Sequence, residues 1–180
     1  MNNEQLIAVR KLYEGLHGLL SNSTLKLSLM KSFPSIRNID PERIFWLESL
    51  QFMVYISNAD GEISQREVNT MNYITGEYLS LNDIRDLVSK KDLLSDFNIE
   101  PPLTAKILCV LENLLYQEGE KLDGDHSIMN MLIMYYEAIG TLVADSDDCM
   151  LSVEYSRIKQ IVNQIKKYAA ANTLSPFYKY

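Results

Sequence analysis

Hydrophobic residues recur every three or four positions along most of the chain, which is the spacing of one face of an α-helix. Residues 24–32 also alternate as a strand would, but this run is short and isolated, so a short helix is favoured. Other strand-like segments are nearly absent. The pattern predicts an all-α fold, a single domain of about seven or eight helices. The predicted helices cover residues 3–20, 24–32, 41–59, 64–78, 81–89, 103–118, 127–144 and 152–171.

Two of these predicted helices, 41–59 and 127–144, are apolar on nearly all sides, which is typical of helices at the centre of a domain. Asp40 and Pro41 suit the N-cap and the first position of the helix that follows them. Ser64 and Glu67 have the spacing of a capping box, in which each side chain pairs with the other residue's backbone amide. Gly61 allows the positive φ angle of a sharp turn between helices.

The excess of acidic over basic residues argues against some classes of binding partner. The chain of 180 residues carries 17 Lys and Arg against 24 Asp and Glu, a formal net charge of −7. Nonspecific nucleic-acid binding requires basic side chains that neutralise phosphates, so we expect no nucleic-acid partner. An acidic surface suits a basic protein partner or a bound cation.

Features associated with export or membrane insertion are missing from the pattern. Cys109 and Cys149 lie 40 residues apart without a CxxC motif, which is typical of idle thiols in a reducing compartment. The first residues lack a basic segment followed by an apolar run, so we expect no signal peptide. No apolar run is long enough for a transmembrane helix. The expected location is therefore cytoplasmic.

The helix-to-helix corners form an approximate internal repeat. Ala59-Asp60 ends one apolar helix and Ala144-Asp145 ends another. Glu67 follows the first corner and Glu154 follows the second, each near the start of the next helix. The second corner is two residues longer and lacks a glycine. The repeat indicates a duplicated helix-turn-helix pair.

The first corner, Ala-Asp-Gly-x-Ile-Ser-x-x-Glu over residues 59–67, resembles the tellurite-resistance TerB-like family of small helical domains. The similarity covers residues 41–171, with 1–40 as an N-terminal helical extension and 172–180 as a C-terminal tail. It implies an all-helical domain that works in stress response and binds divalent metal through acidic loop residues. The metal ligands that it implies are Asp60, Glu67, Asp145 and Glu154.

These four carboxylates can be interpreted in three ways. If the duplicated helix pairs face each other, their mutual repulsion would be relieved by a hard cation such as Ca²⁺ or Mg²⁺, bound weakly. Alternatively, all four serve only to cap and end helices. An independent EF-hand would place Ile56 at the first ligand position of its loop, where an Asp belongs, so this third interpretation is disfavoured.

The predicted function is a non-enzymatic interaction module with a protein partner and a weak divalent-cation site. The alternative is a metal-independent helical protein, such as a subunit or an immunity-type inhibitor, that meets a basic target through its acidic surface. An enzyme is disfavoured because no nucleophile motif, phosphate loop or HExxH motif is present. His126 beside Asp123 and Asp125 has the residue types of a metal-ligand trio, but a polar loop that starts a helix explains these residues better.

Overall fold

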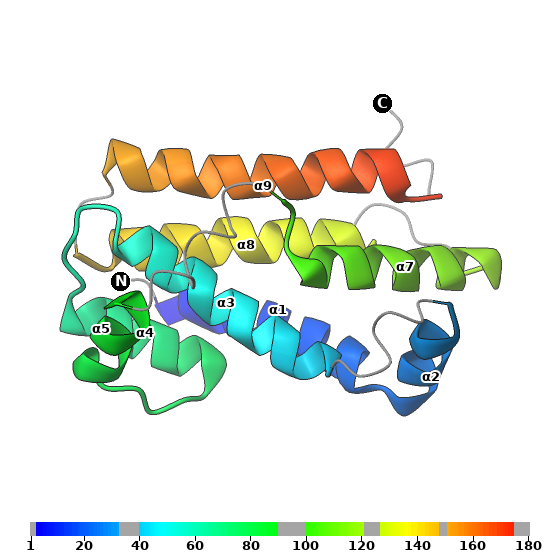
Figure 1. Ribbon diagram of the computed structural model, residues 1–180, viewed down its shortest axis with the longest axis horizontal. Helices are drawn as coiled ribbons and strands as arrows, with labels where there is room; N and C mark the ends of the chain where they lie inside the picture. Colours follow the sequence, from blue (N-terminus) through cyan, green and yellow to red (C-terminus); the bar gives the residue numbers. More distant parts are fainter. Residues whose placement is uncertain (1–2, 33–39, 90–99, 121–126, 148–150, 175–180) are drawn as a thin grey trace.

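The computed structural model describes residues 3–32, 40–89, 100–120, 127–147 and 151–174. Within them the protein is an all-α single domain of eight α-helices and one short 3-10 helix, with no strand. The helices are α1 (Asn3–Ser21), α2 (Ser23–Ser32), α3 (Pro41–Ser57), α4 (Gln65–Thr75), α5 (Leu81–Ser89), α7 (Leu103–Gln117), α8 (Ile128–Ala144), the 3-10 helix η4 (Asp145–Asp147) and α9 (Ser152–Asn172). The predicted fold class and helix number are confirmed (Figure 1).

The ends of the helices follow the predicted signals, with one difference. Asp40 caps α3, with its carboxylate accepting from the amide of Glu42, and Pro41 occupies the first helical position. The predicted helix over 64–78 stops three residues early, at Thr75, because Gly76 adopts a left-handed φ of 78° and ends it. Tyr78, three residues beyond the end of α4, is 98% exposed.

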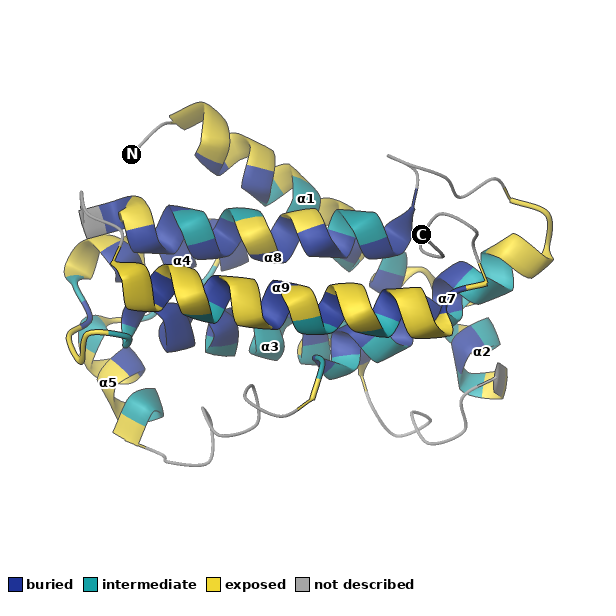
Figure 2. Ribbon diagram, turned by 90° about the horizontal axis from the view of Figure 1, so that it is seen from above, coloured by how far each residue is buried: buried dark blue, intermediate teal, exposed yellow. Residues whose placement is uncertain are grey.

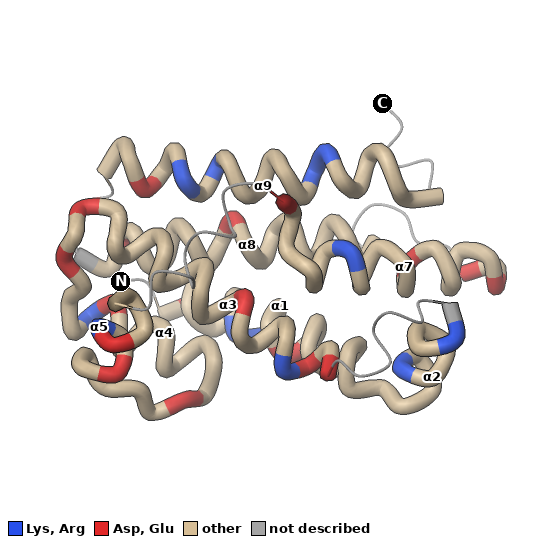
Figure 3. The backbone as a smooth tube through the Cα atoms, viewed as in Figure 1, with Lys and Arg blue, Asp and Glu red and all other residues tan. Residues whose placement is uncertain are grey.

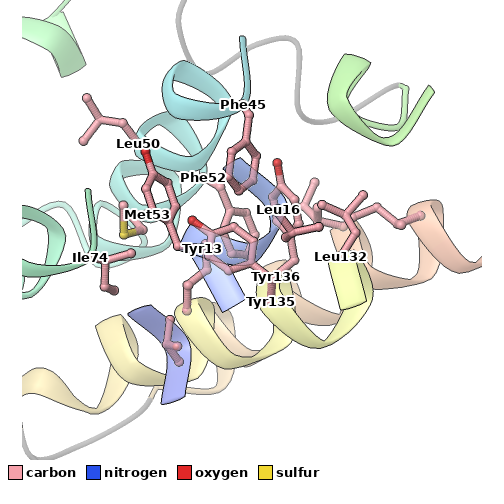
Figure 4. Close-up of a cluster of buried hydrophobic side chains, with 14 of the residues drawn as sticks. Tyr13, Leu16, Phe45, Leu50, Phe52, Met53, Ile74, Leu132, Tyr135 and Tyr136 are labelled. Atoms are coloured by element: carbon pink, nitrogen blue, oxygen red, sulfur yellow. The ribbon is translucent and has the colours of Figure 1, made fainter. Parts of the chain in front are cut away.

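Helix α8 is the centre of the domain, as its apolar sequence predicts. It packs against α9, α1, α3, α7 and α4. Its two adjacent tyrosines, Tyr135 and Tyr136, are fully buried among aromatic rings from α1 and α3 (Figure 4). The ring centroids of Phe45 and Tyr135 lie 5.3 Å apart, and those of Phe52 and Tyr136 lie 4.9 Å apart. These are favourable distances for tilted and edge-to-face aromatic pairs.

Gly140 allows α8 and α9 to approach closely. A Cβ atom at this position would lie 2.7 Å from Cγ1 of Ile158, closer than packed carbon atoms tolerate, and 3.1 Å from Cζ of Phe52, which would have to shift slightly. The α8–α9 contact is the most extensive in the domain. A glycine inside a helix lowers stability by about 0.5–1 kcal/mol relative to alanine. Here the close approach of α8 and α9 requires a residue without a Cβ atom.

The N-terminal helix belongs to the same core as the rest of the domain. α1 packs against α8, α4 and α3, and its buried side chains join the single hydrophobic cluster. Figure 2 shows buried positions along the α1 ribbon. The five buried residues of α1 are Leu6, Val9, Tyr13, Leu16 and Leu20. Residues 3–21 are therefore integral to the folded unit.

Several sequence-based hypotheses fall on residues outside the described ranges. These are the group Asp123, Asp125 and His126, the thiol of Cys149 and the tail beyond Leu174. In the part of the chain that the structure does describe, no helix is both long and apolar enough to cross a membrane.

Candidate functional site

The first corner, the connection between α3 and α4, is held by its own side chains. Asp60 Oδ1 accepts a hydrogen bond of 2.9 Å from the amide of Glu62, and Gly61 turns the chain with a φ of 89°. Ser64 Oγ accepts from the Glu67 amide at 3.2 Å, and Glu67 Oε2 accepts from the Ser64 amide at 2.7 Å. The predicted capping box is confirmed, and it leaves Glu67 only 3% exposed.

The second corner, the connection between α8 and α9, repeats half of this arrangement. Glu154 Oε2 accepts from the amide of Leu151 at 2.7 Å, the same distance as at the first corner. Leu151 has no side-chain oxygen that could return the bond. Before it, Asp145 begins the 3-10 helix η4 and is exposed, whereas Glu154 is buried.

The structure brings the two corners to one end of the domain. Figure 1 shows the α3–α4 connection and the junction of α8 with η4 at the same end of the bundle, and η4 packs against α4. Asp60 and Asp145 are exposed there, while Glu67 and Glu154 each accept from a backbone amide. Among the described residues, no three His, Cys, Asp or Glu side chains gather closely enough to hold a metal ion.

Two further glutamates, the half-buried Glu48 and the buried Glu112, accept from the starts of other helices, and no local sequence pattern indicates them. Glu48 of α3 accepts from the amides of Leu103 and Thr104, at 2.6 and 2.8 Å, at the start of α7. Glu112 of α7 is fully buried and accepts from the Met129 amide at 2.7 Å and from the Ser127 hydroxyl at the start of α8. We call Glu48, Glu67, Glu112 and Glu154 the helix-end glutamates.

Desolvation shifts the pKa values of three groups near these helix starts, Glu48, Cys109 and Glu112. Desolvation raises the pKa of Glu112 above its usual value, although hydrogen bonds from Met129 and Ser127 partly oppose it. The pKa of Glu48 is raised for the same reason. Desolvation and the nearby Glu112 raise the pKa of Cys109 to about 11, so this thiol is an inert part of the core.

Two arginines donate hydrogen bonds to backbone carbonyls at helix C-termini, as the glutamates accept from amides at helix N-termini. Arg10 of α1 donates to the carbonyls of Tyr73 and Ile74 in the last turn of α4, at 3.1 and 2.6 Å. Arg157 of α9 donates to the carbonyl of Tyr55 near the end of α3, and its guanidinium lies 4.4 Å from the centroid of the Tyr55 ring. Cations at these positions also interact favourably with the helix dipole.

A strongly apolar opening lies elsewhere, between the antiparallel helices α1 and α8. This groove has a volume of about 410 Å³. Its hollow shape follows from Ala8 and Ala138, whose one-carbon side chains face the space between the two helices. Met134, on its α8 wall, is 48% exposed. The apolar lining consists of Ala8, Val9, Leu12, Met134, Ala138 and Leu142, and the polar lining of Gln5, Glu137, Thr141 and Asp145.

The groove carries negative charge and no positive charge on its lining. Glu137 and Asp145, which we call the rim carboxylates, are both exposed. Glu137 is the only charged residue of α8. Lys and Arg lie along α9 and on other helices, among them α2 and α7 (Figure 3), and Arg10 of α1 donates to carbonyls at the end of α4. Asp145, predicted as a metal ligand, therefore contributes to an apolar groove in the folded protein.

Comparison with known proteins yields no relative. No protein-family model matches the chain, and neither does any curated protein. No solved structure matches it. The resemblance to TerB-like domains therefore stays a prediction, and we infer the function from the geometry of this molecule.

Proposed function

We propose that this chain is a non-enzymatic, cytoplasmic interaction module that binds a protein partner in the groove between α1 and α8. The groove itself supports the proposal, because it is an open apolar channel between two ordered helices. Apolar side chains left exposed in a continuous channel commonly mark a binding site. The binding of a peptide helix between two helices is a recurrent mode of protein recognition.

Photo-crosslinking in cells that naturally express the chain tests this proposal. A benzophenone amino acid at Ala8 places the reactive group in the groove, whereas the same amino acid at Ser156, an exposed position of α9, serves as the matched control. We expect one discrete protein adduct from position 8 and none from position 156. The adduct is then identified by mass spectrometry.

Competition establishes the specificity of the adduct. Excess unlabelled wild-type protein should abolish it in a lysate, whereas an excess of Ala8→Trp, in which the indole fills the groove, should leave it in place. Equal labelling from positions 8 and 156, or no adduct from position 8, would contradict the proposal.

A weak Ca²⁺ or Mg²⁺ site at the two corners is the second proposal, and it corresponds to the TerB-like, stress-response interpretation. It is supported by the packing of η4 against α4, which brings the corners of the proposed duplication to one end of the domain. A cation there would compete with the amides of Ser64 and Leu151 for Glu67 and Glu154, so its affinity would be low.

Thermal unfolding of metal-stripped protein tests the cation site. A cation that binds only the folded state raises the unfolding midpoint once its concentration passes Kd. A rise with Ca²⁺ or Mg²⁺ that disappears in Asp60→Ala, but persists in the exposed control Asp86→Ala, would support the site. If the site has a millimolar Kd, about 100 mM of the ion must shift the unfolding midpoint. A midpoint that stays unchanged with every divalent ion up to that concentration would reject the cation site.

A further inference from the structure

We infer that the groove binds an amphipathic α-helix of about three turns that carries two lysines or arginines seven or eight positions apart. This inference rests on the proposed function, because it names the class of partner that the same groove accepts. Three features of the groove carry it: its length, its small floor residues and the positions of its charges.

The length of the groove matches a short helix. Its α8 wall runs from Met134 to Asp145, the first residue of η4, a separation of eleven positions that spans about 17 Å at the helical rise of 1.5 Å per residue. The lining positions on α8 recur at the helical spacing of three and four, so the wall is one continuous stripe: 134, 137, 138, 141, 142 and 145. A guest of about three turns would cover this stripe.

The floor of the groove allows a guest backbone to approach closely. Ala8 is exposed and Ala138 is half-buried, and both line the groove. Leucine or methionine side chains on a guest helix, at the spacing i, i+3, i+4 and i+7, would fill the space that the two alanines leave.

The rim carboxylates specify the charge of the guest. Glu137 and Asp145 are eight residues apart, about 12 Å along the axis of α8. Two basic side chains separated by seven or eight positions on a guest helix have the same spacing. Because no Lys or Arg is among the lining residues, an acidic guest would meet only repulsion there.

The same charges argue against two other occupants. The carboxylate of a fatty acid would face two carboxylates on the rim. A second copy of this chain would have to place its most basic helix, α9, in the groove. The exposed positions of α9 between Lys159 and Lys166 include the polar residues Gln160 and Asn163. That face of α9 lacks the apolar stripe that the groove requires.

Synthetic helical peptides test the inference directly. The basic probe is a fluorescent 14-residue peptide with leucines at i, i+3, i+4 and i+7 and lysines flanking that stripe seven positions apart. The acidic probe replaces the two lysines by glutamates and keeps the leucines. Affinities are measured by fluorescence anisotropy with the full chain. We expect the basic probe to bind and the acidic probe to bind at least about tenfold more weakly.

Charge-reversed protein provides the reciprocal test. In the double variant Glu137→Lys/Asp145→Lys, the preference should invert, so that the acidic probe binds more tightly than the basic one. The matched control, Asp86→Lys/Glu118→Lys, changes the net charge by the same amount at two exposed positions outside the groove. It should change the affinity for the basic probe by less than about threefold, since distant exposed charges are largely screened by salt.

The outcomes separate this inference from the proposed function. If Ala8→Trp abolishes the binding of both probes but the charge reversal changes neither affinity, the groove is a docking site and the basic guest is wrong. If the basic probe does not bind up to about 1 mM, or if Ala8→Trp leaves its binding unchanged, the inference is also overturned. Displacement of the probe by laurate, or self-association that Ala8→Trp prevents, would identify one of the other two occupants. The crosslinking result decides the proposed function independently.

Discussion

The helix-end glutamates and the rim carboxylates are the same chemical group in opposite surroundings. Glu67, Glu112 and Glu154 are buried and accept from backbone amides at helix N-termini, each at 2.7 Å. The rim carboxylates, Glu137 and Asp145, are exposed beside an apolar groove. The comparison shows that the role of a carboxylate here follows from the group that it faces.

The difference assigns stability to one set and recognition to the other. Replacing a buried carboxylate leaves its backbone N–H donors without an acceptor. This lowers the free energy of unfolding by about 1–3 kcal/mol per buried group. An exposed carboxylate contributes little to folding, but it sets the electrostatic potential that a partner meets. Substitutions should therefore separate the two sets.

The largest expected effect is that of Glu112→Ala. This change removes the acceptor of the Met129 amide and of the Ser127 hydroxyl, and it leaves a cavity between α7 and α8. We expect the free energy of unfolding to fall by about 2–4 kcal/mol, measured by urea denaturation. The control Glu118→Ala, at an exposed position near the end of the same helix, should stay within about 0.5 kcal/mol of wild type.

The pH dependence of stability tests the burial of Glu112. Because burial raises its folded-state pKa, the folded protein holds this proton more tightly than the unfolded chain does. The resulting stabilisation is fully present below the unfolded pKa, about 4.3, and is lost as the pH rises through the folded pKa. Glu112→Gln lacks this titration. The stability of wild type relative to Glu112→Gln should therefore fall as the pH rises above about 4.3, and an increase with pH would contradict the burial of Glu112.

The two corners should respond to the same substitution in the same direction. Glu67→Ala and Glu154→Ala each remove the acceptor of an amide that precedes a helix, so we expect losses of about 1–3 kcal/mol in urea denaturation. Ser64→Ala, which removes only the other half of the first capping box, should cost about 1 kcal/mol. A corner glutamate that can be replaced without loss would not belong with the helix-end glutamates.

The smallest effect on stability is expected at the rim. Glu137→Ala and Asp145→Ala should each change the free energy of unfolding by less than about 0.5 kcal/mol, because both side chains are exposed. The same variants should weaken the binding of the basic probe. Unfolding by urea and anisotropy with the same protein samples measure both quantities. A large loss of stability with unchanged binding would place these residues with the helix-end glutamates.

The sequence predicted the fold class better than the site for a physical reason. Helix periodicity, the Asp40 cap and the Ser64–Glu67 box are local signals, and the structure confirms them. Glu48 and Glu112 accept from helices that begin 55 and 15 or more residues away, so no local pattern indicates their role.

The groove was missed because it depends on how two distant helices pack. Ala8 and Ala138 are ordinary helix residues until α1 lies against α8, and only then do they leave a hollow. The single charge of α8, at Glu137, is the one sequence signal that could have indicated this face, since a carboxylate is almost never fully buried unless other groups pair with it.

The central claim is that the groove between α1 and α8, and not the first corner, is the binding site. An NMR titration of ¹⁵N-labelled protein with the basic probe tests it most directly, because it reports on the backbone amides of both regions at once. We predict that the largest shift changes will map to residues 5–12 of α1 and 134–145 of α8, while residues 58–67 of the first corner change little. Shift changes centred on the first corner, or none on the walls of the groove at saturating peptide, would contradict the assignment of the groove as the binding site.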